Sequence, residues 1–242
     1  MLIDRYHQRI NEQVQKVETS QRESCLAAGR LVADCVKNGG AVHVFDTGHI
    51  INSELIYRGG GLLLLKQLKY TLQVENPVRA RDRSGVDTSM EGLAAYVLRA
   101  SGALPGDVLF IGSVSGKTVN VVDLAIEARK FGMKVIAVTS LEYSSSVPSL
   151  HSSGKRLFEC ADIVLDNCTP AAEAMLEVEG LEARFAAASG ISAALLLWSV
   201  CAAAIDELLA AGLKPSVLKS ENFEDGPAYN AELKKRYEET GL

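Results

Sequence analysis

The sequence predicts an α/β protein in which helices cover both faces of a parallel sheet. Two of its apolar segments, 108–111 and 134–138, are continuous runs rather than alternating patterns, as is typical of strands buried on both faces. Such runs alternate along the chain with segments of helical periodicity. The 242 residues show no internal repeat, low-complexity tract or linker, so we expect one domain over 1–242.

The expected elements follow one another in chain order. The segment 4–37 has apolar residues at steps of three and four and stops at Asn38-Gly39-Gly40, so it predicts a helix that forms an N-terminal helical arm over 1–38. After it we expect a strand at 41–45, a helix from Asn52 or Ser53 to Gly59, a helix at 89–102, a strand at 108–111, a helix from Lys117 or Thr118 to Gly132, strands at 134–138 and within 161–167, one long helix or two short ones at 181–211, and a terminal helix at 228–240. The segment 62–74 is ambiguous between helix and strand, and 76–89 and 143–155 are expected to be loops.

Composition excludes several classes of partner. The net charge of −5 gives no electrostatic case for binding nucleic acid or an anionic membrane. Five cysteines without C-x-x-C spacing predict buried thiols in a reducing compartment, and no His/Cys/Asp cluster has metal-ligand spacing, so we expect neither a metal nor a cofactor. The charged N-terminus is unlike a signal peptide, which favours a cytoplasmic location.

One segment has the length of a membrane span. Residues 185–205 are 21 residues without a charge, long enough to cross a bilayer. The segment is rich in Ala and Ser and no basic cluster flanks it, which favours a buried helix of a soluble protein. Because its small side chains allow close packing, we expect it at the core or at a subunit interface.

In an open parallel sheet, ligands bind beyond the carboxyl ends of the strands. Three such ends are readable, at 46–54, 112–118 and 139–140, and the second is the most specific. Its sequence GSVSGKT resembles a nucleotide-binding P-loop, but only three residues separate Gly112 from Gly116 where that motif needs four. The glycines allow a tight turn, and hydroxyls beside a helix N-terminus suit a phosphate monoester. The alternative is that Ser and Thr only cap the helix.

The stretch 110–140, FIGSVSGKTVNVVDLAIEARKFGMKVIAVTS, resembles the central motif of the sugar isomerase (SIS) domain family. Two flanking segments are similar to its phosphoheptose-isomerase-like branch, ELIYRGG at 54–60 and SENFEDGPAYN at 220–230. The likeness of order and pattern extends over roughly residues 5–235.

The resemblance implies a three-layer α/β sandwich with a five-stranded parallel sheet, a homodimer or homotetramer, and a phosphosugar ligand. It places the phosphate on Ser113, Ser115, Gly116 and Thr118. The family's first loop usually reads G-x-G-x-S, whereas the matching letters here are Asp46-x-Gly48-x-Ile50, so its serine is lost. The further ligand contacts that we predict are Gly48, Ser53, Lys117 and Thr139.

The activity implied is aldose–ketose isomerisation of a phosphosugar through an enediol, which needs a base near the carbon and an acid near the oxygens. The segment SMEGL resembles the glutamate-bearing segment of phosphoheptose isomerase, so Glu91 is the predicted base, although an exposed glutamate in the first turn of a helix fits equally. The family's histidine in the last long helix is missing, and His49 is the predicted substitute. The alternative is a phosphosugar-binding or regulatory module without turnover.

Overall fold

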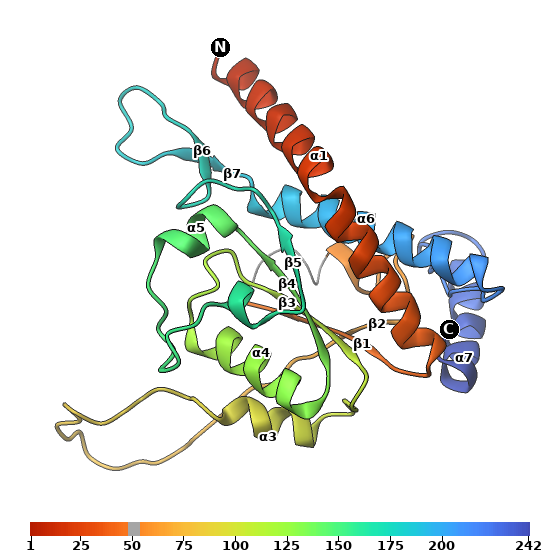
Figure 1. Cartoon of the computed structure of the whole chain (residues 1–242), viewed down its shortest axis with the longest axis horizontal. Helices are drawn as coiled ribbons and strands as arrows, with labels where there is room; N and C mark the ends of the chain where they lie inside the picture. The colour runs from red at the N-terminus through yellow and green to blue at the C-terminus, as the bar shows by residue number, and fades with distance from the viewer. Residues whose placement is uncertain (48–53) are drawn as a thin grey trace.

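The protein has a central sheet of five parallel strands in the order β2-β1-β3-β4-β5 (Figure 1). The computed structural model describes residues 1–47 and 54–242. The strands are β1 (Val42–Asp46), β2 (Leu65–Gln67), β3 (Val108–Gly112), β4 (Lys134–Thr139) and β5 (Ile163–Asp166). All four neighbouring pairs are parallel. The predicted five-stranded parallel sheet is therefore confirmed.

Helices cover both faces of this sheet and make three layers. The helices are α1 (Leu2–Lys37) and α6 (Ser189–Ala210) on one face, α3 (Leu93–Ala100) and α4 (Val119–Phe131) on the other, with α5 (Leu141–Ser146) and α7 (Gly226–Thr240) at the periphery. Alternate residues along the strands belong to two separate hydrophobic cores, one on each face of the sheet. Val44, Phe110 and Ile136 join the core that contains α1 and α6, and Phe45, Leu109 and Val135 join the core that contains α3 and α4.

The boundaries of several expected elements differ from the prediction. The segment 143–155 is only partly a loop, because residues 143–146 belong to α5. The helix expected at 89–102 begins only at Leu93, because Gly92 before it has a left-handed backbone with φ 86°. Residues 181–188 are not helical. They belong partly to a small antiparallel hairpin of β6 (Ala174–Leu176) and β7 (Phe185–Ala187), which the sequence analysis missed. The helix expected from Asn52 or Ser53 to Gly59 starts outside the described residues, and residues 56–60 are not helical.

Helix α6 is long and apolar enough, by length and composition, to cross a membrane. In this structure it packs along α1, and its residues Leu196, Val200 and Ala204 lie in the main core. At the crossing, a β-carbon on Gly29 of α1 would come within 2.4 Å of the Ala203 β-carbon, so the two backbones are in close contact. The predicted core position is confirmed, and a role of this helix in a subunit interface stays a prediction.

The five cysteines are buried free thiols. Burial raises the pKa of Cys25 and of Cys35 to about 11 and that of Cys201 to about 12. These groups are therefore neutral at physiological pH and behave as small apolar side chains.

Candidate functional site

A cavity of about 740 Å³ opens at the carboxyl ends of β1 and β2, next to the N-terminus of α4. The cavity is lined by Phe45, Asp46, Thr47, Gln67, Leu68, Lys69, Tyr70, Thr88, Ser89, Met90, Leu93, Val119, Asn120 and Asp123. A volume of this size accommodates a small metabolite, and the edge of the sheet is where parallel α/β proteins bind ligands. The cavity is therefore the strongest candidate for a binding site.

The loop of residues 113–118 connects β3 to α4 at this edge and is pinned to β4. The Ser113 N–H donates to the Val138 carbonyl oxygen at 3.0 Å, and the Val114 carbonyl oxygen accepts from the Ser140 N–H at 3.0 Å. Gly116 has φ 56°, and a β-carbon there would lie 3.0 Å from the Leu157 β-carbon. The glycine is needed for both conformation and space, so the motif fixes the shape of the loop.

The hydroxyls of this loop are free in the described part of the chain. Thr118 is the N-cap residue of α4 but its side chain makes no capping hydrogen bond. Within residues 1–47 and 54–242, the hydroxyls of Ser113, Ser115 and Thr118 also have no hydrogen-bond partner. Capping, the alternative explanation for these residues, therefore does not describe Thr118, and the first N–H groups of α4 point toward the same loop.

The remaining predicted ligand contacts fall into three groups. Thr139 is fully buried, and its hydroxyl donates to the Val114 carbonyl oxygen at 2.9 Å. In this structure its side chain therefore anchors loop 113–118 to β4. The Lys117 backbone carbonyl accepts from the Leu150 N–H, and no ion pair engages its ammonium among the described residues. Gly48, Ser53 and the predicted acid His49 lie outside the described residues. Ligand contact by these five residues stays a prediction.

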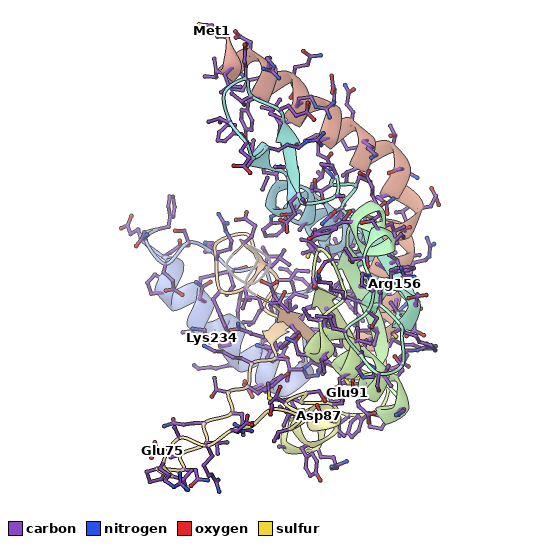
Figure 2. All side chains as sticks on the ribbon, turned by 90° about the vertical axis from the view of Figure 1, so that its left-hand side faces the viewer. Met1, Glu75, Asp87, Glu91, Arg156 and Lys234 are labelled. Carbon is purple, nitrogen blue, oxygen red and sulfur yellow. The ribbon has the colours of Figure 1, made fainter. Side chains whose placement is uncertain are left out.

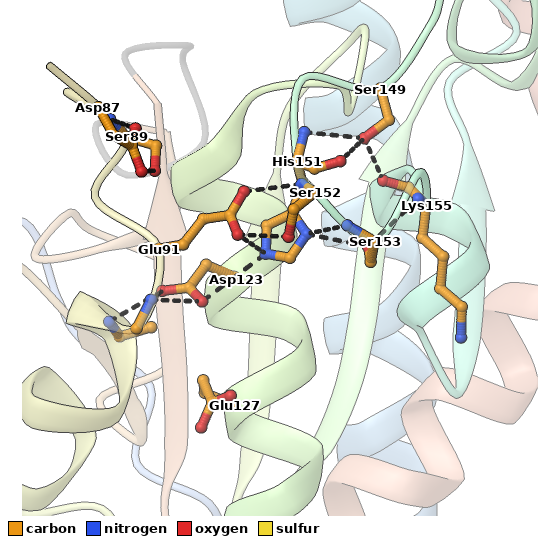
Figure 3. Close-up of polar contacts among 12 residues, drawn as sticks. Asp87, Ser89, Glu91, Asp123, Glu127, Ser149, His151, Ser152, Ser153 and Lys155 are labelled. Atoms are coloured by element: carbon orange, nitrogen blue, oxygen red, sulfur yellow. Dashed lines mark hydrogen bonds and ion pairs between the residues drawn. The ribbon is translucent and has the colours of Figure 1, made fainter. Parts of the chain in front are cut away.

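Glu91 lies in the turn before α3, and loop 149–155 holds its carboxylate (Figure 3). Its two oxygens accept hydrogen bonds from the Ser152 N–H, at 2.7 Å, and from the Ser152 hydroxyl. The hydroxyl is the larger cause, and together these bonds hold the pKa of Glu91 below its usual value. A carboxylate held in this way is ionised at neutral pH and is a weaker base than a free one.

Two residues near Glu91 were missed by the sequence analysis. Asp123 on α4 lines the cavity, and its buried carboxylate accepts from the Gly92 and Ala94 N–H groups. The His151 Nε2 lies 3.8 Å from Asp123 Oδ1 and 4.0 Å from Glu91 Oε2. Figure 3 shows all three side chains converging from different segments. Spacing in the sequence gives no signal for this, because 91, 123 and 151 meet only in the fold.

Replacing Ser152 by alanine tests the cause of the lowered pKa. Ser152→Ala removes the hydroxyl donor to Glu91 and keeps the backbone donor. We therefore expect the pKa of Glu91 to rise toward its usual value. As the pH falls, the variant should then lose the contact between the turn and loop 149–155 at a higher pH than the wild type does. The measurement is an NMR titration of the Glu91 carboxyl carbon, with Ser146→Ala as the control. An unchanged midpoint would contradict the assigned cause.

The two flanking motifs meet each other rather than the cavity. The Gly60 N–H donates to the Leu218 carbonyl oxygen at 2.7 Å, and a β-carbon on Gly59 would lie 2.9 Å from the Ser220 nitrogen. Buried Asn230 bonds both backbone groups of Lys219. These glycines and the asparagine therefore join segments 54–60 and 218–230 into one unit beside the sheet.

Comparison with known proteins agrees with this architecture. The SIS domain profile matches residues 5–140. A UPF0309 protein of Streptomyces griseus is 36% identical over 92% of this chain and 89% of its own, and a UPF0309 protein of Geobacillus kaustophilus is 32% identical over 98% and 95%. The solved phosphoheptose isomerase of Francisella tularensis shares the fold, with a TM-score of 0.51 at 18% identity over 84% of this chain and 95% of that one. The protein thus belongs to the SIS domain family.

Proposed function

We propose that this protein binds a phosphosugar at the carboxyl edge of its sheet and interconverts the aldose and ketose forms. The observation that carries the proposal is the set of free hydroxyls on loop 113–118, placed at the N-terminus of α4 beside a cavity of about 740 Å³. Backbone N–H groups and hydroxyls there suit the phosphate, and the cavity suits the sugar. The similarity to phosphoheptose isomerases supports the same ligand class.

The reaction would proceed by moving one proton between neighbouring carbons. A base takes the proton from C2 of the aldose, the electrons of that bond form the enediol, and the proton is delivered to C1 while a hydroxyl proton passes from O2 to O1. We assign the base to Glu91 and the acid to His49. The chain would work in the cytoplasm as a homodimer or homotetramer, without a metal or cofactor.

A binding module without turnover is the second candidate. Two observations favour it. The Glu91 carboxylate is engaged by Ser152, and α6, the last long helix, contains no histidine. Exchange of the C2 proton with solvent separates the two functions, because only the isomerase forms an enediol.

Replacing the loop hydroxyls tests the phosphate site. Ser115→Ala and Thr118→Val should each weaken phosphosugar binding by about 1–3 kcal/mol, the usual effect of losing a hydrogen bond to a charged group. Calorimetry with a panel of hexose and heptose phosphates measures it. Thr19→Val on the exposed face of α1 removes a hydroxyl that bonds only its own helix and should change nothing. Wild-type affinity in both loop variants would refute the phosphate site.

A further inference from the structure

The segment 71–90, called here the long loop, is the most exposed stretch of the described chain. It connects β2 to α3 without a helix or strand, and every one of its residues is exposed. It projects from the body of the protein, with Glu75 far from Asp87 and Glu91 at its base (Figures 1 and 2). Ordered loops longer than about 12–15 residues without secondary structure are uncommon and are often functional.

Within the described chain, one hydrogen bond joins the long loop to the body: at the end of the loop, the Leu93 N–H donates to the Met90 carbonyl oxygen at 3.1 Å. The other hydrogen bonds of the loop are internal, such as those of Ser84 with Asp82 and of Ser89 with Asp87. It also exposes large apolar side chains, among them Leu72, Val74 and Val78. Exposed apolar surface on a segment that is held to the body only at its ends is typical of a surface that binds a ligand or a partner.

The long loop carries three arginines at alternate positions, Arg79, Arg81 and Arg83. None of them takes part in an ion pair or a side-chain hydrogen bond within residues 1–47 and 54–242. Arginine is the side chain best suited to phosphate, because its planar guanidinium donates two parallel hydrogen bonds to neighbouring oxygens. Three unpaired guanidinium groups on one loop are therefore a candidate anion contact.

The base of the long loop is part of the candidate site. Lys69 and Tyr70 before it, and Thr88, Ser89 and Met90 at its end, line the cavity. The segment that carries the arginines is thus attached to the cavity wall at both ends. Arg83 is five residues from Thr88, a distance of at most about 17 Å along an extended chain, so the cavity is within its reach.

The cavity needs positive charge if its ligand is a phosphosugar. Its lining contains two aspartates, Asp46 and Asp123, and one cationic residue, Lys69. Loop 113–118 adds hydroxyl and N–H donors and one further cation, Lys117. A phosphate monoester brings close to two negative charges at neutral pH, which two lysines beside two aspartates do not balance.

We propose that the long loop folds over the cavity when a phosphosugar binds, and that Arg79, Arg81 and Arg83 supply the guanidinium contacts to its phosphate. The apolar residues of the loop then pack on the apolar part of the cavity wall, which includes Leu68, Leu93 and Val119. The inference rests on the proposed function, since it names further residues for the same ligand.

The test combines affinity with protection from proteolysis. The triple variant Arg79→Gln, Arg81→Gln, Arg83→Gln should bind hexose or heptose phosphates at least about tenfold more weakly than wild type, the loss expected for one charge-assisted hydrogen bond. Binding of the unphosphorylated sugars should not change. In the wild type, a saturating phosphosugar should slow trypsin cleavage after these three arginines, located by mass spectrometry, while the unphosphorylated sugar should not.

The control removes three positive charges elsewhere. Arg22→Gln, Lys130→Gln and Lys235→Gln change exposed residues that do not line the cavity, so the affinity should stay at the wild-type value. Equal affinity of the arginine variant and the wild type for a phosphosugar overturns the inference and leaves the proposed function intact. Loss of self-association in the arginine variant with unchanged affinity also overturns it and makes the loop a subunit contact. If no phosphosugar binds the wild type at all, the proposed function itself fails.

Discussion

Glu91→Gln should slow exchange of the C2 proton of a bound phosphosugar with solvent by about 10²–10⁴-fold, the usual contribution of a general base. Glutamine keeps the size of glutamate, and its carbonyl oxygen can still accept one hydrogen bond from Ser152, but it cannot take a proton at neutral pH. Phosphosugar affinity should survive because the proposed phosphate contacts lie on loop 113–118 and not on Glu91. The measurement is NMR in deuterated water, which detects enediol formation even when net conversion is small.

Two comparisons make this result interpretable. Ser152→Ala keeps the carboxylate and removes only one of its donors, so it should retain far more exchange than Glu91→Gln. Asp123→Asn alters the carboxylate that lines the cavity. If Glu91→Gln exchanges as fast as wild type while Asp123→Asn does not, the base is Asp123 and the assignment to Glu91 is wrong. If the wild type exchanges no phosphosugar that it binds, the module without turnover is the better description.

Gly29→Leu should strongly destabilise the packing of α1 against α6. A β-carbon at this position already meets the Ala203 β-carbon at 2.4 Å and the Ala204 nitrogen at 2.9 Å, so a larger side chain must push α1 and α6 apart. Overpacking of this kind costs about 3 kcal/mol or somewhat more. For a protein of this size that corresponds to a fall in Tm of about 6–12 °C, measured by thermal denaturation.

Gly102 provides the control position for the Gly29→Leu substitution. A β-carbon at Gly102 meets no atom within 4 Å, so Gly102→Leu should change Tm much less than Gly29→Leu. Equal effects of the two substitutions would show that glycine acts at position 29 through chain flexibility rather than through the close approach of α1 and α6.

Much of the fold could be predicted because its strands and helices carry strong local patterns. The runs at 108–111 and 134–138 are strands buried on both faces, and Gly132 ends α4 in the left-handed conformation expected of it. The hairpin β6–β7 could not be predicted, because each strand has three residues and is stabilised by packing of Met175 and Leu176 near α1 rather than by periodicity. The sequence pattern is thus enough to predict the long elements, whereas the short strands form through tertiary contacts that the pattern does not show.

For a similar reason, only part of the candidate site could be predicted from the sequence. Loop 113–118 is a continuous motif, so its residues and its place at the edge of the sheet follow from the sequence. The neighbours of Glu91 come from α4 and from loop 149–155, and their approach depends on how these segments pack. Asp123 is an ordinary polar residue in the sequence of α4, and only the fold places it in the cavity wall.

The central claim is that a phosphosugar binds at loop 113–118 and the adjacent cavity. Amide chemical shifts in a ¹H–¹⁵N NMR titration test it most directly, because they report the place of binding together with the affinity. The account predicts that a bound hexose or heptose phosphate shifts the amides of Ser113, Ser115 and Thr118 and those of Val119 and Asn120 at the start of α4, and that the unphosphorylated sugar shifts the loop amides less. Shifts confined to the depression between Tyr57 and Lys219, or no shifts with any phosphosugar, would contradict it.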